Sequence, residues 1–199
     1  MISLEERCLN YQKVFPKYPS PDVGSDGRMT GTWMIGQNYQ NVAGYYGEYP
    51  RSYLKRIMAL FPDKTNKEDI LHLFSGSIQS SEGVTFDVNS QLNPDIYGDA
   101  HQLSRYFPNK TFSLILADPP YSSEDAKKYG TPMITRNKVV KECAKLLPPQ
   151  GFLCWLDQVF PMYRKDQFDL VGLITIIRST NHRVRVVFIF QKRHQTGVK

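Results

Sequence analysis

The sequence is most informative at Phe112-Ser113-Leu114-Ile115-Leu116-Ala117-Asp118-Pro119-Pro120-Tyr121. The mostly apolar first six residues predict a buried strand, and an acidic residue, two prolines and an aromatic residue follow directly. Each proline fixes its own φ and restricts the residue before it, so the carbonyl groups of this turn are oriented before any ligand binds. Because ligands in open α/β sheets bind at the carboxyl ends of strands, we expect a binding site here.

The side chains of this turn suit a flat ring that carries an amino group. Asp118 provides an acceptor for the amine, and Tyr121 provides an aromatic face on which a ring can stack. Adenine and cytosine both have this shape. The same four residues could also form an ordinary turn, since Asp and Pro are common turn residues. The strand in front of them favours the binding site.

The length and composition are those of a soluble, single-domain protein. With 199 residues the chain can bury a sizeable core, and 41% of its residues are hydrophobic and 22% are charged. No apolar run reaches the roughly 18 residues of a membrane span, and the N-terminus lacks the apolar segment of a signal peptide. We therefore predict no membrane partner.

Cysteine and histidine are sparse in this sequence. The three cysteines, Cys8, Cys143 and Cys154, form no C-x-x-C pair, which predicts reduced thiols in a cytoplasmic protein. The four histidines show no metal-ligand spacing, so we predict no metal site.

The excess positive charge is concentrated at the end of the chain. The net charge is +6, and residues 170–199 contain six basic residues and no acidic residue. A one-sided basic segment is typical of a protein that binds a polyanion such as DNA. The alternative is a solvated face that ends in a basic tail.

The sequence divides into a loop-rich N-terminal arm over residues 1–49, packed on the rest, and one globular unit over residues 50–199. The arm is rich in Pro, Gly, Tyr and Asn, and its residues 15–21 fit neither a continuous helix nor a central strand. Apolar spacing in the globular unit predicts helices over residues 50–61 and 135–147. Strands are predicted over residues 70–74, 84–86, 96–97, 112–117, 151–156, 170–177 and 184–190.

Strands that alternate with helices and end in a hairpin predict an α/β fold with a mostly parallel sheet and one antiparallel strand. The first crossover is expected to be short, because Gly76 and Asp87 are only 11 residues apart. A parallel crossover with a helix takes about a dozen residues or more, so a turn or a loop should replace the helix here.

Taken together, these motifs resemble a class I S-adenosylmethionine-dependent methyltransferase with a Rossmann-like fold. The resemblance is to the type that methylates adenine N6 or cytosine N4 in DNA, and it covers residues 44–190. It identifies Asp118, Pro119, Pro120 and Tyr121 as the catalytic motif. The residues that it implies for S-adenosylmethionine binding are Tyr49, Phe74, Ser75, Gly76, Ser77, Asp87, Asp99 and Ala100.

The cofactor residues also have physical reasons beside the resemblance. A glycine at the end of the first strand lets the backbone approach a cofactor closely. Acidic side chains can accept hydrogen bonds from a ribose diol or an adenine amine. Taken singly, Asp87 or Asp99 could equally be a helix cap or a turn residue. The chain departs from the family where Ser77 replaces a usual second glycine, just before the short crossover.

The resemblance implies that the partner is DNA and that the preferred target is adenine N6. The Asp118 side chain and the Pro119 carbonyl would accept the two N–H bonds of the amine, and Tyr121 would stack on the base. Two other classes stay open. Related motifs occur in methyltransferases of RNA or of protein amides, and a non-catalytic module that binds nucleic acid or a partner is the third alternative.

The hairpin between the last two strands is expected to reach the active-site edge, again by resemblance. Its residues Arg178, Asn181, His182 and Arg183 are predicted to bind DNA, whereas strand alternation points Arg185 to the other face. A plain polar turn is the alternative. No insert is long enough for a separate target-recognition domain, so selectivity is expected from the arm, the 122–136 loop, this hairpin, a homodimer or a partner subunit.

Overall fold

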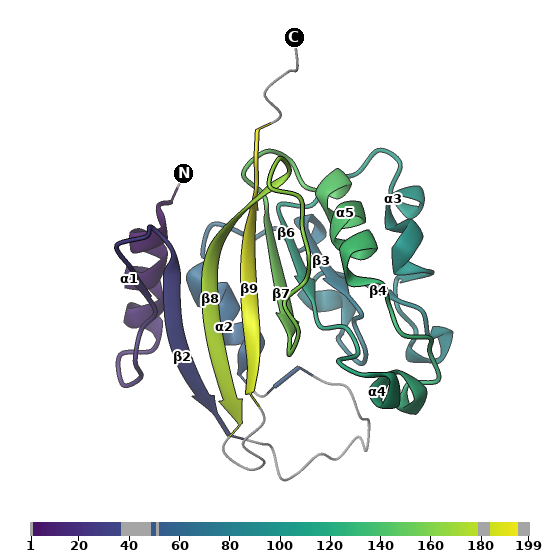
Figure 1. Ribbon diagram of the computed structural model, residues 1–199, viewed down its shortest axis with the longest axis horizontal. Coiled ribbons are helices and arrows are strands. Elements are labelled where there is room, and N and C mark those ends of the chain that lie inside the picture. Colours follow the sequence, from purple (N-terminus) through teal and green to yellow (C-terminus); the bar gives the residue numbers. More distant parts are fainter. Residues whose placement is uncertain (1, 37–48, 51, 179–183, 195–199) are drawn as a thin grey trace.

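The computed structural model describes residues 2–36, 49–50, 52–178 and 184–194, and they form nine strands and five α-helices (Figure 1). The strands are β1 (Asp22–Val23), β2 (Met29–Ile35), β3 (Ile70–Leu73), β4 (Val84–Asp87), β5 (Ile96–Tyr97), β6 (Leu114–Ala117), β7 (Phe152–Asp157), β8 (Phe168–Arg178) and β9 (Val184–Lys192). The helices are α1 (Leu4–Val14), α2 (Tyr53–Leu60), α3 (Leu103–Tyr106), α4 (Ser123–Lys128) and α5 (Arg136–Leu146). Single 3-10 turns are η1 (Lys67–Asp69), η2 (Ser80–Glu82), η3 (Ser90–Leu92) and η4 (Ala100–Gln102).

All strands belong to one sheet, in the order β1-β2-β8-β9-β7-β6-β3-β4-β5. Every strand except β1 and β9 runs in the same direction. The strands β8 and β9 form the antiparallel pair that the sequence predicts at the end of the fold. The predicted α/β class, with a mostly parallel sheet and a C-terminal antiparallel hairpin, is therefore confirmed.

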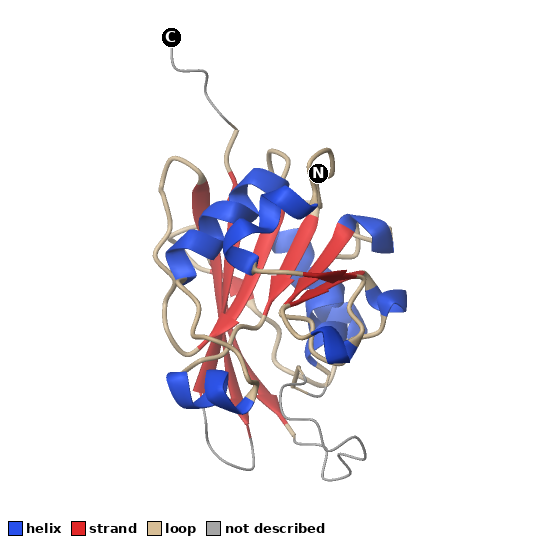
Figure 2. Cartoon of the chain, turned by 90° about the vertical axis from the view of Figure 1, so that its right-hand side faces the viewer, coloured by secondary structure: helices blue, strands red, loops and turns tan. Residues whose placement is uncertain are grey.

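Side chains of the sheet alternate between two hydrophobic cores. Leu114 and Leu116 of β6 pack in the core shared with α1 and α2, whereas Ile115 and Ala117 pack in the core shared with α3 and α5. Helices accordingly cover both faces of the sheet (Figure 2). Continuing this alternation, Asp118 leaves β6 toward the face of α1 and α2.

The segments predicted to form the site lie at one edge of the sheet. The carboxyl ends of β3, β4, β6 and β7 lie at this edge because these strands are parallel. The antiparallel β9 begins here, with Val186 paired to Asp157 at the end of β7. Residues early in β9 and residues late in β6 and β7 are therefore neighbours.

The predicted short first crossover is confirmed. Between β3 and β4 the chain forms only the single turn η2 in place of a helix. The loop bends sharply as it leaves β3, with positive φ angles of 61° at Phe74 and 56° at Gly76. Glycine adopts this conformation readily, but a bulky residue such as phenylalanine is strained there, as residues at functional sites often are.

The N-terminal segment is more regular than the sequence suggests. Residues 4–14 form α1 and residues 29–35 form β2, so the expectation of loops does not hold for these stretches. A capping box begins α1, in which Ser3 and Glu6 each accept the other's backbone N–H. The strand β2 pairs in parallel with β8 along its whole length. The segment therefore extends the sheet.

A buried arginine joins α1 to the residues that follow α2. The Arg7 side chain is fully buried and donates to both carboxylate oxygens of Asp63, at 2.6 and 3.1 Å, and to the Leu60 carbonyl at 3.0 Å. Its guanidinium packs against the rings of Phe61 and Phe152, 4.7 and 4.8 Å from their centroids, and these two rings also contact each other. Paired and stacked in this way, the charge can stay in the core.

The helices of the described residues are short. The longest of them, α1 and α5, have 11 residues each. In this part of the chain no helix combines the length and the apolar character that crossing a membrane requires.

Candidate active site

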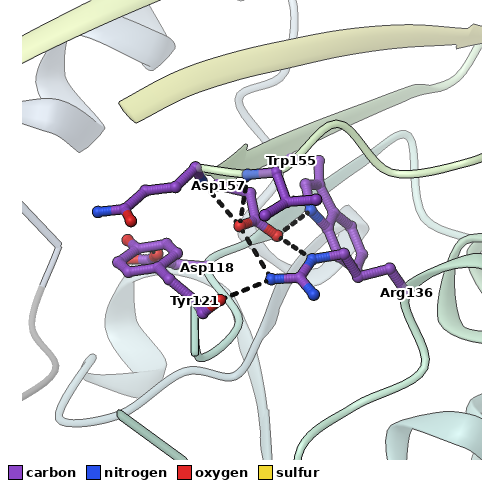
Figure 3. A network of polar contacts seen from close by, with 7 residues as sticks. Asp118, Tyr121, Arg136, Trp155 and Asp157 are labelled. Carbon is purple, nitrogen blue, oxygen red and sulfur yellow. Dashed lines mark hydrogen bonds and ion pairs between the residues drawn. The ribbon is translucent and has the colours of Figure 1, made fainter. Parts of the chain in front are cut away.

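Asp118 and Tyr121 are in direct contact. Asp118 directly follows β6, and the Tyr121 hydroxyl donates a hydrogen bond to Asp118 Oδ1 (Figure 3). Pro119 and Pro120 form the rigid connection between them. An acceptor and an aromatic ring thus lie side by side at the carboxyl edge of the sheet.

The carboxyl group of Asp118 titrates close to neutral pH. Burial raises its pKa to about 6, although the charge of Arg185 and the hydrogen bond from Tyr121 pull the pKa down, and the charge of Asp157 adds to the rise. Burial also keeps the pKa of Tyr121 well above its usual value. At pH 7 Asp118 is therefore mostly ionised and Tyr121 is protonated, so the pair consists of an anionic acceptor and a neutral donor.

Arg185 belongs to the same group of side chains. Its guanidinium carbon lies 4.6 Å from the centroid of the Tyr121 ring, and the residue is only 9% exposed. The expectation that Arg185 faces away is thus wrong, because it shares the face of β9 that Val187 and Ile189 bury in the core of α1 and α2. This alternation is visible in the sequence, but the approach of β9 to the end of β6 is not.

A second buried carboxylate lies beside this group. Asp157, at the end of β7, is fully buried and pairs with Arg136 at the start of α5 (Figure 3). The same arginine donates to the backbone carbonyl of Tyr121 at 3.0 Å. Sequence reasoning missed both residues, because they are 21 positions apart and meet only through the packing of α5 near β6 and β7.

The loop after β3 is tied to the end of β4 by Asp87. The Gly76 N–H donates to Asp87 Oδ2 at 3.0 Å, and the Asn89 N–H donates to Oδ1 at 2.9 Å. Burial raises the pKa of Asp87, and these backbone hydrogen bonds oppose the rise. The predicted cofactor residues Ser75, Gly76, Ser77 and Asp87 are therefore brought together around one loop.

This loop fits the adenosyl part of S-adenosylmethionine. The Ser75 hydroxyl is buried and finds no hydrogen-bond partner within the described residues. A carboxylate has about four acceptor sites, so Asp87 keeps capacity for a ribose diol beside its two backbone bonds. Gly76 lets the backbone approach a ligand closely. The donor, the acceptor and the accessible backbone match the groups of a nucleoside.

Asp99 and Ala100 lie after β5, where Asp99 acts as a cap. Its carboxylate accepts from the backbone N–H of His101 at 2.9 Å and from His101 Nδ1 at 2.7 Å. His101 Nε2 in turn accepts from the Thr135 N–H at 2.9 Å, which assigns the ring proton to Nδ1. The two hydrogen bonds from His101 outweigh burial and lower the pKa of Asp99.

The described residues hold no cluster of three or more His, Cys, Asp or Glu suited to a metal ion.

Tyr49 and Phe74 lie on opposite faces of the sheet. The Tyr49 hydroxyl donates to the Leu116 carbonyl at 3.4 Å, and burial together with the nearby charge of Asp118 raises its pKa well above the usual value. The Phe74 ring packs edge-on against Trp155, with centroids 6.3 Å apart. Tyr49 is thus close to Asp118, and Phe74 is part of the core shared with α3 and α5.

A cleft opens between α4, the residue after β7 and the start of β9. Its volume is about 550 Å³, which is in the range of small-molecule sites. It is lined by Ser122, Glu124, Asp125, Lys128, Gln158 and Val184. Three of these residues are the chain neighbours of Tyr121, Asp157 and Arg185, so the cleft lies near the carboxyl edge of the sheet, but neither Asp118 nor Tyr121 lines it. Its lining carries charges of both signs.

The basic residues near the end of the chain do not form one surface. Arg178 ends β8 at the active-site edge, whereas Asn181, His182 and Arg183 lie outside the described residues. Lys192 ends β9 at the opposite edge and is 7% exposed, and the neighbouring Arg193 pairs with Asp169. The concentration of charge in the sequence is therefore divided in space.

No protein-family model and no curated protein matches this chain. Similar solved structures include TrmN from Thermus thermophilus, with a TM-score of 0.54 and 17% identity over 75% of this chain and 51% of TrmN. An rRNA methylase from Streptococcus thermophilus has a TM-score of 0.45 and 11% identity over 66% of this chain and 91% of its own. SMU.1697c from Streptococcus mutans, a putative methyltransferase solved in complex with SAH, has a TM-score of 0.37 and 14% identity over 64% and 88%.

Of these three structures, TrmN has the TM-score that supports an argument, and at its level of identity the argument concerns the fold alone. The chain spans about half the length of TrmN. Together with the strand order and the C-terminal hairpin, this likeness shows that the chain has the Rossmann-like α/β fold of class I methyltransferases.

Proposed function

We propose that this chain transfers a methyl group from S-adenosylmethionine to an exocyclic amino group of a nucleobase, with adenine N6 in DNA as its target. The observation that carries the proposal is the Asp118–Tyr121 pair at the carboxyl end of β6. It lies on the same sheet edge as the Ser75–Gly76–Asp87 loop, and its chain neighbour Ser122 lines the cleft of about 550 Å³. The fold supports it because ligands of such sheets bind at this edge.

The side chains proposed to act are those that can accept the amine protons. The lone pair of a base amine is delocalised into the ring, which makes it a poor nucleophile. Asp118 and the Pro119 carbonyl would accept the two N–H bonds and draw the nitrogen toward tetrahedral geometry. S-adenosylmethionine supplies an electrophilic methyl group, so an N–C bond forms as the C–S bond breaks. With a pKa of about 6, Asp118 can take the proton that the methylated nitrogen then loses.

In the structure Tyr121 already donates to Asp118, and Arg185 lies over the Tyr121 ring. A carboxylate accepts several hydrogen bonds, so Asp118 can hold the hydroxyl and an amine together. A base would stack on the face of the Tyr121 ring opposite Arg185, or it would displace Arg185 and stack on the face that Arg185 covers. Positioning of this kind can supply about 7–11 kcal/mol of the reduction in barrier.

In the decisive experiment the protein is incubated with DNA, RNA or protein substrates and with S-adenosylmethionine that carries an isotopically labelled methyl group. Digestion to nucleosides and peptides, followed by mass spectrometry, is expected to show the label on N6-methyldeoxyadenosine. Label only on N4-methylcytosine would overturn the adenine assignment, and label in RNA or on a glutamine amide would move the target to that class. Calorimetric titration that shows no binding of S-adenosylmethionine would favour a non-catalytic module.

Replacing Asp87 by alanine should weaken the binding of S-adenosylmethionine at least tenfold, because a charged hydrogen-bond partner is worth about 1.5–3 kcal/mol. Calorimetry measures the Kd directly. Asp169→Ala, which removes an exposed carboxylate from β8, is the matched control and should leave the Kd unchanged. An equal Kd in both variants would remove Asp87 from the cofactor site.

Tyr121→Phe is expected to stay active, whereas Tyr121→Ala should lose about 10–100-fold in methyl transfer, since stacking on a base is worth about 1–3 kcal/mol. Phenylalanine keeps the ring and loses only the hydrogen bond to Asp118. The comparison is made by single-turnover kinetics at pH 8. An inactive Tyr121→Phe variant would instead assign the role to the hydroxyl.

Methyl transfer should decline as the pH falls through about 6, because the ionised form of Asp118 accepts the amine and its pKa lies there. The charge of Arg185 holds this pKa down. Arg185→Gln should therefore move the midpoint of the pH–rate profile to higher pH. A midpoint that stays in place in the variant would show that Asp118 does not set the profile.

A further inference from the structure

The carboxylate of Asp157 is the most completely bonded group near the proposed site. It is fully buried, where an unpaired charge would cost several kcal/mol. Trp155 Nε1 donates to it at 3.0 Å, and the backbone N–H groups of Gln158 and Val159 donate at 2.7 and 3.1 Å. Arg136 adds two bonds, from Nε at 2.7 Å and from Nη2 at 3.2 Å. Asp157 is therefore a fixed point at the end of β7.

Arg136 connects this fixed point to the turn that carries Asp118 and Tyr121. Its Nη2 atom donates both to Asp157 and to the backbone carbonyl of Tyr121, the latter at 3.0 Å (Figure 3). Three donors to Asp157 come from its own strand and the residues that follow, so Asp157 does not depend on Arg136 alone for its partners. Among the described residues, β7 provides no second donor to the Tyr121 carbonyl.

The turn itself has few backbone donors. Pro119 and Pro120 have no N–H groups, so half of the turn cannot donate backbone hydrogen bonds to the rest of the protein. A donor to one of its carbonyl groups, such as Arg136 to that of Tyr121, is therefore a means of restraining the turn. A guanidinium, planar and rigid, can serve a carboxylate and a carbonyl at once, which an ammonium group cannot do with the same geometry.

We propose that Arg136 is a positioning residue, which uses Asp157 as its anchor and holds the Tyr121 carbonyl so that Asp118 and Tyr121 keep the arrangement required for methyl transfer. The inference rests on the proposed function for its catalytic part only. Its structural part, that Arg136 restrains the turn, holds for any activity of this site. A salt bridge that served stability alone would not restrain the turn selectively.

Amide hydrogen exchange tests the restraint without any substrate. In Arg136→Gln the amides of Asp125 and Ala126, which donate to the hydroxyl and the carbonyl of Ser122 directly after Tyr121, are expected to exchange at least tenfold faster than in the wild type, while those of α2 keep their rates. Arg164→Gln is the matched control, because Arg164 pairs with Asp166 at 2.6 Å on the surface, with both side chains more than 60% exposed. Wild-type exchange at these two amides in Arg136→Gln would overturn the proposal.

The Arg136→Lys variant distinguishes the effect of the positive charge from that of the planar guanidinium. The lysine keeps a positive charge beside Asp157 and should restore the melting temperature, yet it cannot bridge to the Tyr121 carbonyl in the same plane, so exchange should stay fast. Restored protection of the turn in this variant would show that charge alone is sufficient and would overturn the proposed role of the bridge. Should Arg136→Gln fail to fold, Arg136→Lys gives the same exchange test.

Kinetics test the catalytic part. Arg136→Gln is expected to lower kcat about 100-fold, the loss that a misplacement of about 1 Å can cause, with the Kd for S-adenosylmethionine within twofold of the wild type. An unchanged kcat in an active enzyme would refute positioning and leave the proposed function standing. Faster exchange of the turn in a chain that methylates nothing would refute the proposed function and leave the restraint by Arg136 standing.

Discussion

Asp118→Ala is expected to abolish methyl transfer, with a loss of at least about 1,000-fold in kcat, and to leave the Kd for S-adenosylmethionine within a few-fold. The variant removes the carboxylate that the target amine would meet, and loss of one preorganised group at a reacting centre costs about 100–1,000-fold or more. Because Asp118 is assigned to the target amine and not to the cofactor loop, the effect should fall on the chemical step. Single-turnover kinetics and calorimetry measure the two quantities, and near-wild-type turnover would refute the assignment.

Asp118→Asn provides the control for folding. A carboxyl whose pKa rises from 3.8 to about 6 on folding is destabilising once it ionises. The stability cost is absent below pH 3.8, grows as the pH rises through about 6 and is complete above it. The asparagine variant should therefore be more stable than the wild type at pH 8 and equally stable at pH 3.5, as measured by urea unfolding. A less stable variant at pH 8 would show that Asp118 is structural.

Arg7→Ala is expected to destabilise the fold by about 3–5 kcal/mol, the usual cost of removing one partner of a buried ion pair. The variant leaves a cavity beside Phe61 and Phe152 and removes the guanidinium that Asp63 binds. Urea unfolding gives the free energy, and the melting temperature should fall by roughly 10 °C.

The surface pair provides the comparison for Arg7. Arg164→Ala breaks an exposed ion pair of similar length and should change the free energy of unfolding by no more than about 0.5 kcal/mol. If Arg7→Ala proves as mild as Arg164→Ala, α1 is not an integral part of the domain, and the N-terminal segment is closer to the packed arm that the sequence suggests.

The globular unit is predictable from sequence because its signals are local. The apolar run before Asp118 is a strand wherever it packs, and α5 carries its apolar residues at helical spacing. In α1, by contrast, Arg7 and Tyr11 are buried whereas the apolar Leu9 and Val14 are exposed, so its sequence lacks a clear apolar face. The capping box of Ser3 and Glu6 is the local signal that could have found α1.

The contacts of the candidate site also differ in whether local sequence predicts them. Asp118 and Tyr121 are three residues apart, and the prolines between them fix their relation, so their contact follows from the sequence. Arg136, Asp157 and Arg185 reach them from three other elements. Their meeting depends on the order β9-β7-β6 and on the packing of α5, which a single sequence does not contain.

The two outermost strands of the sheet have a consequence for how this protein associates with other molecules. Both β1 and β5 are only two residues long, and β1 pairs with Met29 and Thr30 alone. Within the described residues, positions 31–35 of β2 therefore pair with β8 on one side and with no strand on the other. Unpaired outer strands invite strand addition. A second copy or a partner subunit that extends the sheet is therefore expected to add its strand along residues 31–35 of β2.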